Sequence, residues 1–221
     1  MHLHFPQLET ILASLIPPQN FSVDELARTE IDMVVTLLAA WYPTLRTGME
    51  GVHLDPNYYA NEVKLKDEPQ TEQIDWTLVA KHEQKIVGLY SLKYIARARQ
   101  IAGRLIAIDP AFRRSGLSDF GCQILIAIAH HLGAAMIWGT ATLSHTVSQH
   151  TLAKHGFRLC GIFPAYDLDA FESGGSKFVC EAIYCHVLAK PEEMIKPDSA
   201  NMTHAVQSLW NFLSLDSLFK S

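Results

Sequence analysis

Apolar residues recur with helical spacing in three long segments of the chain. In "EIDMVVTLLAAWYP", residues 30–43, acidic residues stand at the start and a proline at the end, as they do at the two ends of a helix. Residues 118–132 place their apolar side chains on one helical face. Residues 145–155 are followed by a glycine, the residue favoured just after a helix C-terminus. Shorter helices are expected at residues 6–16, after residues 55–56 and at residues 203–215.

The remaining apolar segments have the period of strands. Residues 75–95, "DWTLVAKHEQKIVGLYSLKYI", predict a hairpin whose turn is "KHEQ". The segment "FSVDELART", residues 21–29, fits either an edge strand or a helix start. Four further strands are predicted at residues 101–109, 134–143, 157–168 and 178–188.

This order of elements predicts an α/β (α+β) fold with a mixed central β-sheet flanked by helices. We expect a single domain at residues 21–190, preceded by an N-terminal helical extension at residues 1–20. Residues 191–221 are expected to form a linker, "KPEEMIKPDSAN", and an extra C-terminal helix.

Composition narrows the class of protein. Of 221 residues, 48% are hydrophobic and 19% charged, which allows a packed core. The formal net charge of −5 argues against binding to nucleic acid. The four cysteines form no C-x-x-C and are expected to be free thiols, and the histidines show no metal-binding spacing, so no metal is predicted. With no signal-like start and no apolar run long enough for a membrane, we expect a cytoplasmic protein.

The stretch "LIAIDPAFRRSGLSDFGCQIL", residues 105–125, joins a predicted strand to a predicted helix through a loop. Free backbone N–H groups at the start of a helix attract anions, phosphates above all. Gly116 lets the backbone approach a ligand closely, Ser118 adds little bulk, and Arg113 and Arg114 add positive charge. Taken alone, the stretch also fits an ordinary strand–turn–helix.

Two motifs resemble the GNAT superfamily of N-acetyltransferases. "AIDPAFRRSGLS" is similar to the superfamily's V-x-P-x-[YF]-[RQ]-x-x-G-x-[GA] loop, with Ser118 in place of the last Gly or Ala. "HTVSQHTLAKHGF", residues 145–157, is similar to N-x-x-A-x-x-x-Y-x-x-x-G-F. With the order of elements, the resemblance covers about three quarters of the chain.

The resemblance implies a site for acetyl-CoA. Loop amides would hold the pyrophosphate, the backbone of the preceding strand would pair with the pantetheine arm, and the next strand would splay away from it. A backbone N–H near Ala107 or Ile108 would stabilise the oxyanion. By position, the implied coenzyme-binding residues are Ile106, Ile108, Arg113, Arg114, Ser115, Gly116, Leu117, Ser118 and Ser148.

The superfamily's acid and base do not carry over. Its usual tyrosine falls at Leu152, its asparagine at His145, and a base of some members at Ala102. We take His145 and Tyr166 as substitute catalytic candidates, because an imidazole accepts a proton near neutral pH and a phenol donates one.

The variable segment before the first hairpin would build the acceptor pocket, with Glu50, Tyr58 and Tyr59 as substrate-binding candidates. For each, loop solvation is the competing interpretation. Arg97, Arg99 and Arg104 are interpreted as a solvated strand face or as an attraction for the coenzyme phosphates.

These features predict an acetyl-CoA-dependent N-acetyltransferase, an acyltransferase for groups other than aminoacyl groups. It would act on a primary amine of a small molecule or peptide, and a homodimer is possible. One alternative is a non-catalytic acyl-CoA-binding sensor or interaction module, since the usual acid and base are missing. Another is an acyl-CoA decarboxylase of the same fold.

Overall fold

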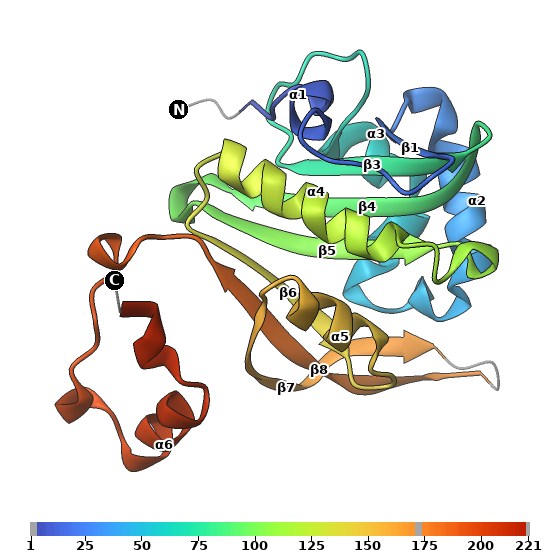
Figure 1. Cartoon of the computed structure of the whole chain (residues 1–221). Coiled ribbons are helices and arrows are strands. Elements are labelled where there is room, and N and C mark those ends of the chain that lie inside the picture. Colours follow the sequence, from blue (N-terminus) through green and yellow to red (C-terminus); the bar gives the residue numbers. More distant parts are fainter. Residues whose placement is uncertain (1–3, 171–173, 220–221) are drawn as a thin grey trace.

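An eight-stranded mixed sheet runs through the molecule, in the order β1-β3-β4-β5-β6-β8-β7 with the short β2 beside β3 (Figure 1). The computed structural model describes residues 4–170 and 174–219. The strands are β1 (Phe21–Glu25), β2 (Val63–Lys64), β3 (Asp75–His82), β4 (Lys85–Ile95), β5 (Gln100–Ile108), β6 (Met136–Thr142), β7 (Arg158–Ala170) and β8 (Ser176–Val187). "FSVDELART" therefore begins with an edge strand, and the predicted mixed sheet is confirmed.

Helices cover both faces of the sheet (Figure 1). The α-helices of the described residues are α1 (Leu8–Leu12), α2 (Ile31–Trp41), α3 (Pro56–Glu62), α4 (Leu117–His131), α5 (Val147–Lys154) and α6 (His204–Phe212), of which α6 lies away from the sheet. Each predicted helix is present, although the two terminal ones are shorter than expected. Within the described residues, no helix combines the length and the apolar character that crossing a membrane requires.

Two hydrophobic cores hold the layers together. On one face, Phe120, Ile124 and Ile128 of α4 pack on the sheet together with Leu8 and Ile11 of α1. The N-terminal extension thus shares the main core. On the other face, α2 and α3 bury Val34, Leu38 and Tyr59. Each such side chain contributes about 1.5–3 kcal/mol by leaving water.

β5 and β6 pair for only part of their length. They run parallel from Gln100↔Met136 to Gly103↔Gly139, and the pairing ends there. A Cβ on Gly139 would stand 3.0 Å from the carbonyl oxygen of Gly103, so glycine permits the close approach. Beyond this point no strand of residues 4–170 or 174–219 pairs with the edge of β5 that faces β6. The splayed strand pair that the resemblance implies is confirmed.

β5 contains a β-bulge directly after its last residue pair with β6. Ser91 pairs with Leu105, but its neighbour Leu92 pairs with Gly103, so Arg104 is an extra residue without a partner on β4. Bulges of this kind re-aim a side chain and bend the strand. Here the bulge lies where β6 departs.

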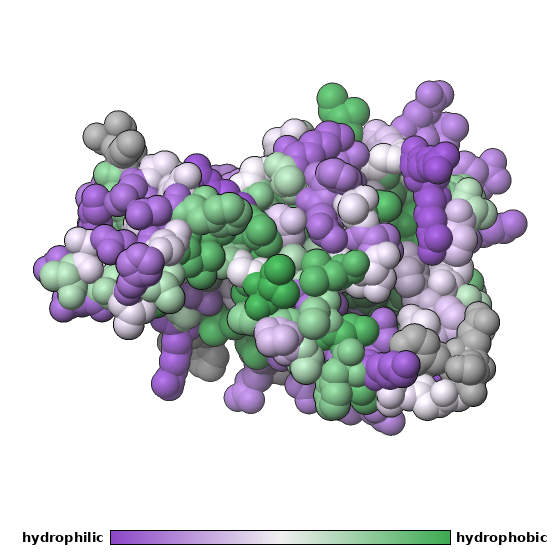
Figure 2. Space-filling model, turned by 90° about the horizontal axis from the view of Figure 1, so that it is seen from below, coloured by the Kyte–Doolittle hydropathy of each residue, from purple (hydrophilic) through white to green (hydrophobic). Residues whose placement is uncertain are grey.

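The C-terminal segment lies beside the sheet and covers neither of its faces (Figure 1). Ion pairing of Arg99 with Glu193 and a hydrogen bond from Arg158 to Ser217 tie it to the body. Figure 2 shows hydrophobic side chains on the face that carries β7 and β8. The exposed apolar residues of β7, β8 and α6 are Leu159, Ile162, Phe163, Phe178, Val206, Leu209 and Phe212.

Candidate functional site

The loop between β5 and α4, residues 109–116, has the conformation of an anion-binding turn. The carboxylate of Asp109 accepts from Ala111 N at 2.9 Å and fixes the start of the loop. Arg114 and Gly116 both have positive φ, +68° and +88°, and α4 begins at Leu117. The first amides of a helix have no partner within it, so those following Gly116 are free to bind an anion.

Two buried hydroxyls at this end of the sheet lack a partner. Among the described residues, none forms a hydrogen bond with the buried Oγ of Ser115 in the loop or with that of Ser148 in the first turn of α5. An unpaired buried hydroxyl costs about 1–3 kcal/mol. A bound ligand with polar groups would satisfy both, so these residues fit the predicted coenzyme.

Alternate amides of β5 point to opposite edges of the strand. Asp109 N donates to Val87 O of β4 at 2.9 Å, whereas Ile108 N donates to the hydroxyl of Tyr42 at 3.1 Å on the other side. By the same alternation, the amide of Ile106 faces the gap and that of Ala107 faces β4. The amide of Ala107 therefore points away from the gap, whereas the amides of Ile106 and Ile108 point towards it.

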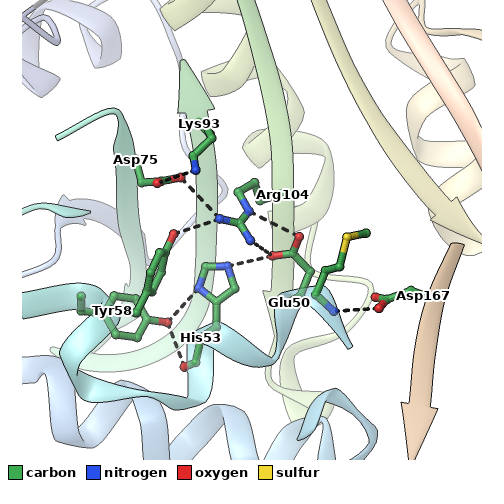
Figure 3. Close-up of polar contacts among 9 residues, drawn as sticks. Glu50, His53, Tyr58, Asp75, Lys93, Arg104 and Asp167 are labelled. Carbon is green, nitrogen blue, oxygen red and sulfur yellow. Dashed lines mark hydrogen bonds and ion pairs between the residues drawn. The ribbon is translucent and has the colours of Figure 1, made fainter. Parts of the chain in front are cut away.

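On the α3 side of the sheet, Arg104 joins a chain of polar groups (Figure 3). Its Nη2 lies 3.1 Å from Glu50 Oε2, which lies 3.1 Å from His53 Nε2. His53 is fully buried, and its Nδ1 lies 3.1 Å from the hydroxyl of Tyr59. These contacts hold Glu50 at the outer end of the network, where its side chain is 23% exposed.

The same guanidinium also faces a deeper carboxylate (Figure 3). Nη1 of Arg104 lies 3.6 Å from Asp75 Oδ1 and 3.4 Å from the hydroxyl of Tyr58, and Lys93 Nζ lies 3.2 Å from Asp75 Oδ2. Arg104 thus connects Asp75, which is buried, with Glu50, which is partly exposed. Tyr58 and Tyr59 are buried parts of the network and support Glu50.

The two carboxyls of the network differ in acidity. Burial would raise the pKa of Glu50, but hydrogen bonding to His53 and the charge of Arg104 outweigh it and lower that pKa. For Asp75, burial dominates over Lys93 and Arg104, and the pKa is raised. Glu50 is therefore held as a carboxylate.

A second group of acids lies across the gap on β7 and β8. Burial raises the pKa of Glu181, and the charges of Asp167, Asp169 and Glu50 raise it further against a hydrogen bond to Thr140. Burial and the charge of Glu181 likewise raise the pKa of Tyr166. These carboxyls are near enough to repel one another, which makes the gap favourable for a cation.

Residues 43–54, the bridging segment, span the gap between α2 and β7. Met49 N donates to Asp167 Oδ1 at 2.7 Å, and Thr47 Oγ1 donates to Leu168 O at 2.9 Å. A Cβ on Gly48 would come within 2.7 Å of the Asp167 carboxylate. The segment that carries Glu50 is therefore fastened to β7.

The two predicted catalytic residues have different surroundings. Tyr166 lies among the acids, stacked on Phe163 with ring centroids 5.4 Å apart. His145 is exposed, beyond the end of β6 and two residues before α5, and its carbonyl accepts from Gln149. Its proposed role stays a prediction.

Sequence reasoning missed several residues of the site. Arg104 is part of the buried network, so neither interpretation holds for it. Arg99 pairs with Glu193 at the end of β5 that is remote from the loop, and its side chain is 52% exposed, which agrees with a solvated position. Glu181 and Asp167 were not singled out. Glu181 is the charged residue within the otherwise apolar segment "VCEAIYC". A charge inside a predicted strand of this kind could have identified it.

Comparisons with known proteins agree with this geometry. The model of the acetyltransferase (GNAT) family matches residues 38–157. No curated protein has a matching sequence.

Solved structures share the fold at low identity. The acetyltransferase of GNAT family from Streptococcus pneumoniae superposes with a TM-score of 0.54 and 18% identity, over 76% of this chain and 99% of its own. A ribosomal L7/L12 alpha-N-protein acetyltransferase gives 0.55 and 11%, over 79% and 98%. The structure of yncA from Salmonella typhimurium with its cofactor acetyl-CoA gives 0.55 and 14%, over 82% and 99%.

Proposed function

Because the chain belongs to the acetyltransferase (GNAT) family, we propose that it transfers an acetyl group from acetyl-CoA to a primary amine of a small molecule or peptide. One observation carries the choice of acceptor. Around the gap where β5 and β6 separate, burial and the charges of Asp167, Asp169 and Glu50 raise the pKa of Glu181. An ammonium group would be attracted there, whereas an anionic acceptor would be repelled.

The coenzyme would lie along the other side of the gap. The amides from Arg113 to Ser118 would hold its phosphates, and the carbonyl of Ile106 and the backbone of Ile108 would pair with its arm. Support comes from the free helix-start amides, from the unpaired hydroxyls of Ser115 and Ser148, and from a neighbour of the same fold solved with acetyl-CoA. When bound, the coenzyme supplies the activated acetyl group.

The chain's own groups would then handle the protons. We assign Glu181 as the base that takes a proton from the ammonium group, because its raised pKa suits a carboxyl that must accept a proton. The amide of Ile106 would donate to the developing oxyanion. Tyr166 keeps its proton at neutral pH, since its pKa is raised, and is assigned as donor to the leaving thiolate.

The cysteines bear on the cellular location of the protein. The free thiols of Cys122, Cys160, Cys180 and Cys185 fit a reducing compartment, so we propose a cytoplasmic enzyme. The homodimer stays a prediction, and sedimentation velocity would measure the oligomeric state. Residues 21–190 are proposed as the catalytic domain.

The release of free coenzyme thiol, followed in the presence of a panel of amines, tests the activity. We expect release from acetyl-CoA that depends on the amine, and an acetylated product by mass spectrometry. A sensor would bind the coenzyme without releasing thiol. A decarboxylase would convert malonyl-CoA without any amine. Either result would replace the transferase assignment.

A further inference from the structure

The hydroxyl of Tyr42 occupies both backbone groups of Ile108. Tyr42 Oη accepts from Ile108 N at 3.1 Å and donates to Ile108 O at 3.1 Å. Tyr42 follows the last residue of α2, and it reaches β5 beyond the last β5–β6 pair, Gly103↔Gly139. A side chain thus takes the place that a neighbouring strand would have there.

The ring of Tyr42 contacts a second group that the coenzyme needs. The guanidinium of Arg113 lies 5.7 Å from the centre of the ring, in a cation–π arrangement. Arg113 is in the loop assigned to the phosphates, and Ile108 is on the strand assigned to the pantetheine arm. Both contacts of Tyr42 therefore involve groups that would face the bound coenzyme.

A backbone N–H has one proton to donate, so Ile108 cannot serve Tyr42 and the coenzyme arm together. We propose that Tyr42 is an internal competitor of the coenzyme. It closes the unpaired edge of β5 in the free protein, and the arm of the coenzyme displaces it. This inference rests on the proposed function, because it takes the coenzyme site as given.

Displacement of Tyr42 would also act on the acceptor side. Tyr42 leads directly into the bridging segment, residues 43–54, and its carbonyl accepts from Leu45 N at 3.0 Å. The far end of that segment is fastened to β7 through Thr47 and Met49. Release of Tyr42 removes the anchor at Ile108, while the ion pair of Glu50 with Arg104 and the anchor on β7 remain. Coenzyme binding would thereby loosen the segment that carries Glu50 before the acceptor arrives.

Calorimetric titration with coenzyme A tests the competition. Tyr42→Phe keeps the ring and removes the hydroxyl, so the two groups of Ile108 become free for the coenzyme. We expect the variant to bind coenzyme A about three- to tenfold more tightly than the unmodified protein, the value of one to two exchanged hydrogen bonds. Tyr94→Phe is the matched control and should leave the affinity unchanged. Tyr94 is a buried tyrosine of β4 that pairs with Ile101 near the start of β5.

The sign of the result separates the possibilities. Equal or weaker binding by Tyr42→Phe would overturn the inference, because the hydroxyl would then be idle or a ligand of the coenzyme. If the unmodified protein does not bind coenzyme A at all, the proposed function fails first. The two failures are therefore distinguishable.

Two further readouts need no turnover. Trp41 precedes Tyr42, and we expect its fluorescence to change when coenzyme A binds, with Trp41→Phe identifying its share of the signal. In the unmodified protein, hydrogen exchange in residues 43–54 should become faster with coenzyme A. Slower or unchanged hydrogen exchange in that segment would contradict the loss of the anchor between Tyr42 and Ile108.

Discussion

The proposed coenzyme side and the proposed acceptor side of the gap are built from different chemical groups. The coenzyme side consists mainly of backbone: the edge of β5, a loop with positive φ at Arg114 and Gly116, and the first amides of α4. The acceptor side consists of ionisable side chains, with Glu50 and Arg104 facing Glu181 across the gap. Backbone can hold one ligand while side chains vary, so the second side can change substrate without disturbing the first.

The most severe test of this division is the removal of one acceptor-side charge. Glu181→Gln should lower turnover by about 10²-fold or more, the size of a general-base contribution. Affinity for coenzyme A should stay within about twofold, because the substitution leaves the backbone side intact. Steady-state kinetics with calorimetry measure both, and Glu83→Gln in the exposed β3–β4 turn is the control. Unchanged turnover would remove Glu181 from the chemistry.

The opposite change breaks the backbone side. Gly116→Asp forces a side chain onto a residue with φ of +88° and places a negative charge where phosphate would bind, so coenzyme affinity should fall by about 10²-fold. Gly133→Asp is the matched control, since Gly133 also has positive φ, +60°, and a Cβ there meets nothing within 4 Å. Equal losses in calorimetry would mean that the effect is on folding.

The network beneath the acceptor side can be broken without touching the loop. Arg104→Met leaves the Glu50 and Asp75 carboxyls without their shared partner, which should cost about 2–3 kcal/mol in the free energy of unfolding. Urea denaturation would measure it. Adding Glu50→Gln should recover part of the loss, because one uncompensated charge disappears. A double variant no more stable than Arg104→Met would show that the two residues are not coupled.

The two acids that face each other should respond oppositely to pH. The pKa of Glu181 is raised by folding, so its ionisation destabilises the protein as pH rises through that raised pKa. Glu181→Gln should therefore raise Tm by about 2 °C at neutral pH and have no effect at pH below about 4.

The pKa of Glu50 is lowered by folding, so its carboxylate stabilises the protein above its usual pKa of 4.5. That stabilisation is lost as pH falls through the lower value of the folded state. Glu50→Gln should consequently lower Tm at neutral pH. Thermal scans at several pH values compare the variants, and shifts of the same sign would contradict the opposed shifts.

The smallest effect is expected at His145. Because its side chain is exposed and Glu181 is the proposed base, His145→Ala should change turnover and the coenzyme KM by less than about threefold. A loss of about 10²-fold in turnover at constant KM would instead make His145 the base. A raised KM restored by His145→Asn would give it a positioning role.

The backbone side of the site could be predicted because it lies in one continuous stretch. Residues 105–125 contain the strand edge, the loop and the helix start together, so their spacing is fixed by local geometry. The order of strands and helices was predictable for the same reason. Helix ends shifted by a few residues: α5 begins at Val147 rather than His145.

The acceptor side could not be predicted in this way, because segments far apart in the sequence meet there. Arg104 points into the network only because a bulge makes it an extra residue, and no local pattern in "IAGRLIAID" indicates the bulge. His53 and Asp75 come together through tertiary packing. Glu50 was identified by its place in the variable segment, and its partners were not.

The short pairing of β5 with β6 has a mechanical consequence. Among the described strands, only the four residue pairs from Gln100↔Met136 to Gly103↔Gly139 join the β1–β5 part of the sheet directly to the β6–β8 part, whereas β7 and β8 share nine pairs. The sheet thus has two extensively paired parts, the plates β1–β5 and β6–β8. The four β5–β6 pairs form a short seam between them. Under a pulling force applied across the plates, the seam should rupture before either plate unravels. In an optical trap, extension should therefore occur first at β5 and β6, with a separate and stronger event for each plate.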